Sequence, residues 1–149
     1  MRYRNYLMVA ILILSLSGIT WAGVQEEVDQ SFQQRLQAIH AGNAEAVAAF
    51  FAEDATMTPS GSPFRFEGRE AIRTYYEGLF RAFPAVRVMV HQRTTQFYNN
   101  ATAVTSTYYT VTLVDKNEQA RRVHARSSVT RINLDGKWLI ANQHMSQLP

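Results

Sequence analysis

The last segment of the chain carries polar side chains of chemical interest at alternate positions. The stretch KWLIANQHMS (137–146) has the composition of a β-strand, in which alternate residues share one face. Strict alternation from Trp138 and Ile140 puts Asn142, His144 and Ser146 on the same face, which we expect to be the concave one. An imidazole there can transfer protons near neutral pH, so His144 is the candidate catalytic acid or base. A histidine held by a buried hydrogen bond is the alternative.

Arg126, in the preceding predicted strand, is the candidate anion-binding residue. It shares strand parity with Ser128, which we predict as a second ligand contact. An inward arginine in an apolar interior needs an anion or another acceptor, and its planar fork suits a carboxylate. The alternatives are a surface arginine or an ion pair with Glu67 or Glu77.

Aromatic residues supply the predicted walls of the pocket. Tyr76 lies in a predicted helix, while Tyr108 and Tyr109 are adjacent in a strand and must point to opposite faces. We predict Tyr76, Tyr109 and Trp138 as apolar ligand contacts, with Asn142 as a polar one. Ordinary core packing is the alternative for each aromatic residue.

Several kinds of site have no matching pattern in the sequence. The four histidines lack the paired spacing of a metal site, and there is no cysteine, phosphate-binding glycine loop or Gly-x-Ser-x-Gly motif. We therefore expect no metal and no cofactor. An isomerase that uses a carboxylate base needs an acid on a pocket strand, and Asp115 and Asp135 fall at turns. Asp54, near the end of the second predicted helix, is the one acid left for such a role.

The elements that must position these residues fall into two halves. Helical spacing of apolar residues predicts helices over 26–42, 44–54 and 69–83, with Gly42 ending the first and Asn43 capping the second. A short strand and a turn-rich loop follow the second helix over 56–68. Alternating Val, Thr and Tyr then predict strands over 86–98, 101–115, 120–134 and 137–146. Helices before a run of strands indicate an α+β fold with a curved antiparallel sheet.

Three stretches of the sequence resemble a known family. The segments AGNAEAVAAFFAEDATMTPSG, FEGREAIRTYYEGLF and ARSSVTRINLDGKWLIANQHMS together resemble the nuclear transport factor 2-like superfamily, which includes SnoaL-like and ketosteroid isomerase-like proteins. The closest branch is the association domain of calcium/calmodulin-dependent kinase II and its bacterial relatives. The resemblance implies a cone of about six strands around three helices, a pocket at the open end that His144 enters, and homo-oligomers. Tyr109 stands where that branch has an arginine, which departs from its pattern.

The beginning of the chain has the pattern of an export signal. Arg2 and Arg4 precede the apolar run LMVAILILSLSGIT, and small residues follow at Thr20 and Ala22. We expect a signal peptide over 1–22, a single domain over 23–149, and a periplasmic or secreted protein; an uncleaved anchor is the alternative. Residues 23–149 have a net charge of +1, which does not favour nucleic acid as a partner. We expect no membrane contact after cleavage.

Three functional hypotheses remain open at this stage. The first is an exported protein that binds a small molecule, or a carboxylate-bearing ligand, and self-associates as a homodimer or higher homo-oligomer. The second is an isomerase, cyclase or hydrolase in which His144 acts as acid or base. The third is an oligomerisation module without a ligand.

Overall fold

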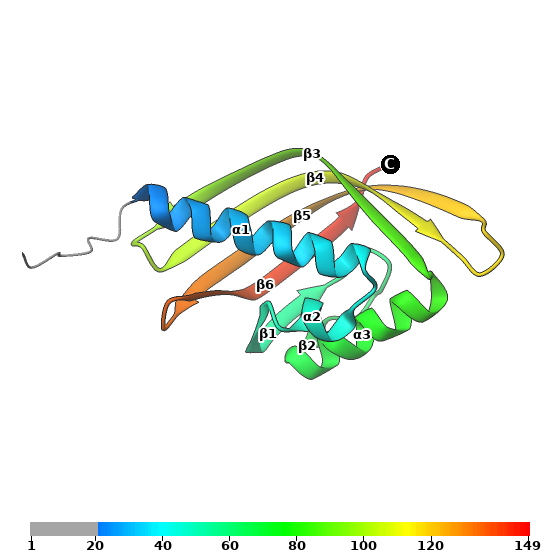
Figure 1. Ribbon diagram of the computed structural model, residues 1–149, viewed down its shortest axis with the longest axis horizontal. Coiled ribbons are helices and arrows are strands. Elements are labelled where there is room, and N and C mark those ends of the chain that lie inside the picture. Colours follow the sequence, from blue (N-terminus) through cyan, green and yellow to red (C-terminus); the bar gives the residue numbers. More distant parts are fainter. Residues whose placement is uncertain (1–20) are drawn as a thin grey trace, which may run out of the picture.

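Three helices pack on one side of a six-stranded sheet in the computed structural model, which describes residues 21–149 (Figure 1). The helices are α1 (Trp21–His40), α2 (Ala44–Ala48) and α3 (Arg69–Ala82). The strands are β1 (Phe51–Thr58), β2 (Phe66–Glu67), β3 (Ala85–Tyr98), β4 (Thr102–Val114), β5 (Ala120–Leu134) and β6 (Lys137–Gln147). The predicted α+β class is confirmed, whereas nearly all of the predicted signal peptide lies outside the described residues.

The sheet is mixed rather than purely antiparallel. Its strand order is β2-β1-β6-β5-β4-β3, and all neighbours are antiparallel except β1 and β6, which are parallel. The chain can make this parallel pair because helix α3 and the long β3–β5 meander separate β1 from β6. The strand that follows α2 thereby becomes part of the main sheet.

The boundary between α2 and β1 corrects the predicted second helix. That helix ends at Ala48, and Phe51 already belongs to β1. Phe51, Ala55 and Met57 are completely buried, and the Ile140 amide of β6 donates to the Phe50 carbonyl at 2.8 Å. Pairing with a buried strand therefore outweighs the helical propensity of the alanine-rich segment.

The predicted turns have the expected backbone. Gly42 ends the first helical segment with φ +66°, and the Asn43 side chain accepts from the Ala46 amide at 2.9 Å. Asp135 and Gly136 both have positive φ, as a two-residue hairpin turn requires. These local signals fix the lengths of the strands that line the interior.

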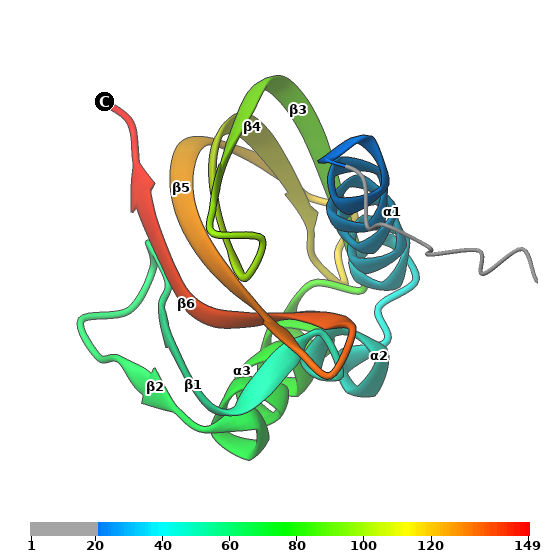
Figure 2. The same ribbon diagram turned by 90° about the vertical axis from the view of Figure 1, so that its left-hand side faces the viewer.

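Two bulges bend the long strands around the helices. The register of β3 with β4 shifts at His91, and the register of β5 with β6 shifts at Ala141. A bulge bends its strand and increases the local twist. Seen end-on, the sheet curls into a half-barrel, with α1 along its open side next to β3 and with α2 and α3 below (Figure 2).

The hydrophobic core has two parts. The larger one lies among α2, α3, β1 and the middle of β6, around Phe51, Met57 and Ile72. The smaller one closes one end of the half-barrel, where Val28 of α1 packs near Trp138. None of the helices within residues 21–149 has both the length and the hydropathy of a membrane span.

Candidate functional site

A cavity of about 390 Å³ lies between α1, α3 and the concave face of β3–β6. Its size falls in the ordinary range of small-molecule pockets. Its walls are largely apolar, its polar groups are hydroxyls, amides and guanidinium groups, and no Asp, Glu or His within residues 21–149 lines it. Its lining residues are Phe32, Arg35, Leu36, Ile39, Ser60, Gly61, Tyr75, Tyr76, Leu79, Phe83, Val86, Val88, Val90, Thr105, Thr107, Tyr109, Val111, Leu113, Arg121, Val123, Ala125, Ser127, Val129, Arg131, Gln143, Met145 and Gln147.

The predicted concave position of His144 is wrong, and the cause is the bulge in β6. Arg131 pairs with Ile140 and Thr130 pairs with Asn142, so Ala141 has no partner on β5. Alternation restarts after this extra residue, and Gln143 then points inward while His144 points outward. The concave side of β6 therefore offers the cavity an amide rather than an imidazole.

Asn142 and Ser146 follow His144 to the outer face. The Asn142 amide donates to the Thr56 hydroxyl at 2.7 Å, which bridges β6 and β1. The Ser146 hydroxyl accepts from Nε of Arg126 at 3.1 Å. These polar groups bond to each other or to neighbouring strands on the exposed side of the sheet.

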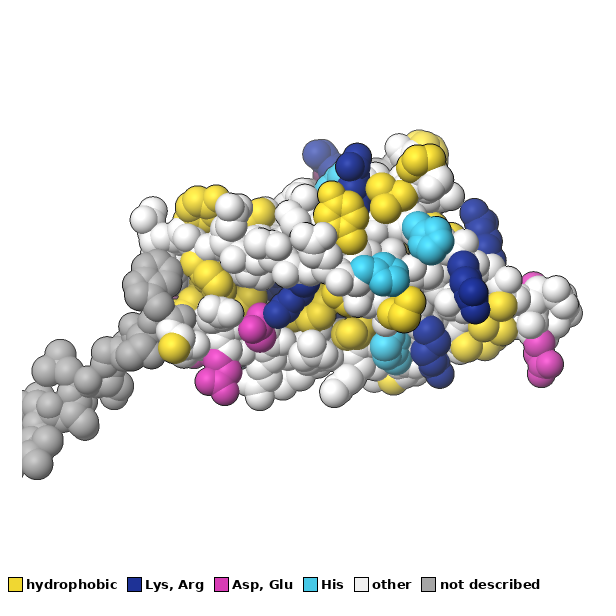
Figure 3. Space-filling view, turned by 90° about the horizontal axis from the view of Figure 1, so that it is seen from above, with side chains coloured by type: hydrophobic (Ala, Val, Ile, Leu, Met, Phe, Trp, Pro, Cys, Tyr) yellow, Lys and Arg dark blue, Asp and Glu magenta, His cyan; other side chains and the backbone are white. Residues whose placement is uncertain are grey.

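Arg126 and Ser128 also lie on the outer face of β5, so their predicted inward orientation is wrong. Both are exposed, and the alternate residues Ala125, Ser127 and Val129 face the cavity instead. The space-filling view from above shows histidine side chains and basic (lysine or arginine) side chains distributed over that face of the molecule (Figure 3). In the sequence of β5, the apolar residues Val123, Ala125 and Val129 alternate with polar ones, and this pattern identifies the concave side of the strand.

The predicted aromatic residues divide between the cavity and the core. Tyr76 and Tyr109 line the cavity, whereas Tyr108 is 42% exposed on the opposite side, as alternation predicts. Trp138 packs in the core at the closed end, and its indole Nε1 donates to Glu27 at 3.1 Å. Whether Tyr76 and Tyr109 contact a ligand stays a prediction.

Arg35 of α1 extends into the interior and is only 7% exposed. Its Nη2 donates to the Tyr76 hydroxyl at 2.9 Å and to Oε1 of Gln143 at 2.7 Å. The guanidinium carbon lies 5.2 Å from the centre of the Phe51 ring, which adds a cation–π contact. Arg35 thereby joins α1, α3 and β6 at one point in the wall of the cavity.

Arg131 of β5 is the second buried arginine and is 1% exposed. Its Nη1 donates to the Thr105 hydroxyl at 3.1 Å. Burial lowers the pKa of Arg131 to about 9, and the nearby cations Arg35 and Arg93 act in the same direction, while Asp29 opposes them. Because this pKa is still above neutrality, the cavity contains a second positive charge at pH 7.

A third arginine, Arg93 of β3, supports this positive region. The bulge at His91 brings Arg93 to the concave face, where it forms an ion pair with Asp29 of α1. The guanidinium carbon of Arg93 also lies 4.5 Å from the centre of the Phe32 ring. Three buried N–H groups have no acceptor among residues 21–149; they are Arg35 Nε, Arg93 Nη1 and Arg131 Nε. A buried donor without a partner is energetically costly, more so when it is charged, so these groups favour an incoming acceptor.

The cavity phenols act as hydrogen-bond donors rather than as bases. Burial raises the pKa of Tyr109 to about 12, with Tyr76 contributing in the same direction. Burial likewise raises the pKa of Tyr75. Both side chains are therefore protonated at neutral pH, and each hydroxyl can donate a hydrogen bond to an anion.

Sequence patterns mark both buried arginines, although neither was among the predicted site residues. Arg35 falls in the apolar stripe of α1, three residues after Phe32 and four before Ile39. Arg131 continues the apolar alternation of β5 that includes Val129. A charged residue on an otherwise apolar face is the informative exception.

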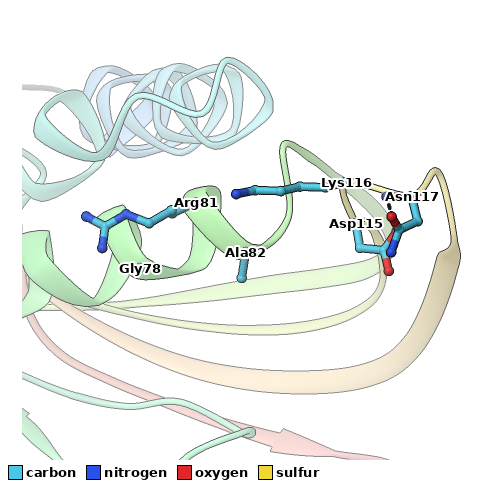
Figure 4. Close-up of a pocket in the computed structure, with 6 residues that line it drawn as sticks. All are labelled: Gly78, Arg81, Ala82, Asp115, Lys116 and Asn117. Carbon is cyan, nitrogen blue, oxygen red and sulfur yellow. Dashed lines mark hydrogen bonds between the residues drawn. The ribbon is translucent and has the colours of Figure 1, made fainter.

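A second hollow, between the end of α3 and the β4–β5 turn, has a different character (Figure 4). Arg81 and Lys116 lie there with exposed side chains, and the Asp115 carboxylate accepts from the amides of Asn117 and Gln119 within the turn. This hollow is open and has no buried polar group. No cluster of three potential metal ligands occurs within residues 21–149.

Comparison with known proteins identifies the family. The model of the calcium/calmodulin-dependent protein kinase II association domain matches residues 24–149. The chain belongs to this family. A solved structure from Xanthomonas campestris, proposed to be such an association domain, is 33% identical, with a TM-score of 0.76 over 83% of this chain and 86% of that one. The predicted family and cone fold are confirmed.

More distant structures share the association-domain fold. A nuclear transport factor 2-like protein from Salmonella enterica is 16% identical, with a TM-score of 0.78 over 87% of this chain and 94% of that one. A proposed scytalone dehydratase from Novosphingobium aromaticivorans is also 16% identical, with a TM-score of 0.77 over 84% of each chain. A search of curated proteins finds no match. At these identities the likeness extends to the fold alone.

Proposed function

We propose that this association-domain protein binds an organic anion in its cavity, with a carboxylate of the ligand next to Arg35 and Arg131. The observation that carries the proposal is this pair of buried arginines, each with an Nε that has no acceptor within residues 21–149. Arginine donates two parallel hydrogen bonds to a carboxylate, and an anion also offsets the buried positive charge. The Tyr76 hydroxyl and the Gln143 amide are already bonded to Arg35 and fix its orientation.

Titration calorimetry with acetate, butyrate, benzoate and octanoate tests the proposal. We expect at least one of these carboxylates to bind, and its neutral amide analogue to bind at least tenfold more weakly because the charge-assisted bonds are lost. Arg35→Met and Arg131→Met should each abolish the measurable heat. Arg126→Met is the matched control, since it removes the same charge from the outer face.

Two results would refute anion binding. One is the absence of binding by every carboxylate of the panel. The other is retention of affinity in both arginine variants when circular dichroism shows them to be folded.

The enzymatic alternative has less support from this cavity. Proton transfer near neutral pH needs a group of matched pKa, and no carboxylate or imidazole lines the cavity. His144 lies on the outer face, and the raised pKa of Tyr109 disfavours a phenolate base. The proposed dehydratase among the solved structures shares only the fold with this chain.

Self-association is the second part of the proposed function. Membership of the association-domain family supports it, because the family is named for assembly.

Export, by contrast, is supported only by the N-terminal sequence pattern. Intact mass spectrometry of the protein purified from an export-competent bacterial host tests it, and a mass that includes residues 1–22 would contradict it.

A further inference from the structure

The concave face of the sheet changes from polar to apolar along its length. Cross-strand pairing arranges the inward side chains in rows, and the row of Thr105 and Gln143 contains one hydrogen-bond partner of each buried arginine. Three rows nearer the β4–β5 hairpin, Val88, Val111 and Val123 lie side by side. No charged or amide side chain belongs to this valine row.

The distance between the two regions suits an extended ligand. Neighbouring rows are two residues apart, so three rows span roughly 20 Å along a straight strand. Helix α1 runs in the same direction as this change from polar to apolar side chains. Arg35 lies at its polar end, and at the other end the His40 imidazole accepts from the amide of Val88 in the valine row at 3.0 Å. The apolar region is therefore covered by α1 and belongs to the same cavity as the arginines.

The helices continue the apolar character on the opposite wall. Ile39 of α1, Leu79 of α3 and Phe83, which follows the end of α3, all line the cavity. A small polar anion bound by the arginines would leave these groups and the valine row without a partner. An alkyl chain attached to the anion would bury them, and burial of apolar surface is the dominant favourable term in association.

We propose that the ligand is an amphipathic monocarboxylate, of the class of unbranched long-chain alkanoates. Its carboxylate contacts Arg35 and Arg131, and its alkyl chain extends past Tyr109 to the valine row. This inference rests on the proposed anion-binding function and adds the chemical nature of the rest of the ligand.

A dicarboxylate is the competing ligand class. Arg121 lies one row beyond Val123, at the rim, and could receive a second carboxylate. Its side chain is exposed and therefore hydrated, so it provides a weaker anchor than the buried pair. A second carboxylate would also have to pass the valine row, where it has no hydrogen-bond partner on the strands.

Calorimetric titration with a homologous series from acetate to hexadecanoate tests the proposed chain. Affinity should rise about fourfold with each added methylene until the apolar region is filled, so octanoate should bind on the order of 200-fold more tightly than butyrate. Hexadecanedioate should bind more weakly than hexadecanoate.

Two variants locate the chain within the cavity. Val111→Thr and Val123→Thr keep the side-chain shape but place a hydroxyl in the apolar row, and each should weaken hexadecanoate binding about tenfold while leaving butyrate binding unchanged. Val104→Thr is the matched control, because Val104 alternates with the inward residues of β4 and lies outside the cavity lining.

The outcomes separate this inference from the function on which it rests. Equal affinity of butyrate and octanoate, with binding still abolished by Arg131→Met, would overturn the amphipathic ligand and leave anion binding intact. Tighter binding of hexadecanedioate than of hexadecanoate would replace the monocarboxylate by a dicarboxylate. Failure of the whole series would refute the proposed function itself.

Discussion

At the scale of single residues, Arg131 is a buried cation whose hydrogen-bond partner within residues 21–149 is one threonine hydroxyl. Its neighbours Arg35 and Arg93 are also positive, and Asp29 is the acid that faces them across the interior. A buried charge with so little compensation lowers the stability of the empty protein. Such an arrangement is understandable if the residue serves binding, because functional groups are often held at the expense of stability.

Arg131→Met should therefore stabilise the empty protein. Removal of the poorly compensated charge is expected to raise the free energy of unfolding by about 1–3 kcal/mol, seen as a midpoint several degrees higher in thermal denaturation. The same variant should lose carboxylate binding. A lower midpoint than that of the wild type would mean instead that the bond to Thr105 holds β4 and β5 together.

The pH dependence of carboxylate binding follows from the lowered pKa of Arg131. Below about pH 9 this side chain is protonated and available to an anion, and above that value the charge is lost while the carboxylate stays ionised. Affinity should be constant between pH 6 and 8 and fall toward tenfold per pH unit above about 9. Constant affinity up to pH 10.5, with an unchanged circular dichroism spectrum, would contradict this prediction.

At the scale of the elements, regular patterns could be predicted from the sequence and irregular ones could not. Spacing and turn residues identify α1, α3 and the four long strands. The end of β6 was misassigned because one extra residue at Ala141 reverses every side chain after it. The faces of β5, which alternates without a break, were misassigned although Ala125, Val129 and the other alternate residues mark its concave side. The parallel pairing of β1 with β6 likewise has no local signal, since it joins residues about 90 positions apart.

Deletion of Ala141 tests the role of the bulge. The deletion should preserve the facing of Ile140 and Gln143, so the protein should fold with a loss of stability of about 1–3 kcal/mol. Deletion of Ser106, from the continuous pairing of β4, is the matched control and should abolish folding because it reverses the side chains that follow. Equal unfolding midpoints for the two deletions would contradict the assignment.

At the scale of the whole molecule, charge is divided unevenly between the two halves of the described chain. Residues 21–84 contain five basic and nine acidic side chains, a net charge of −4. Residues 85–149 contain eight basic and three acidic side chains, a net charge of +5. A contact between the negative half of one copy and the positive half of another would therefore be attractive. Salt weakens such attraction.

Assembly should therefore respond to ionic strength. Size-exclusion chromatography with light scattering is expected to give a dimer or larger species near physiological salt, with a smaller assembled fraction in 1 M sodium chloride. Circular dichroism at both salt concentrations and matched protein concentration separates this effect from unfolding. A monomer under all conditions would remove self-association from the proposed function.

The packing of Trp138 against α1 gives the protein an internal optical probe. The sequence contains two tryptophans, so replacement of Trp21 by phenylalanine leaves Trp138 as the single emitter. Its ring lies edge-on to Phe97 and its indole nitrogen bonds to Glu27 of α1, beyond the closed end of the cavity. Its emission therefore reports whether the first helix is seated on the sheet. Rapid-mixing fluorescence with octanoate would then measure, without any label, whether the ligand enters while that helix stays in place.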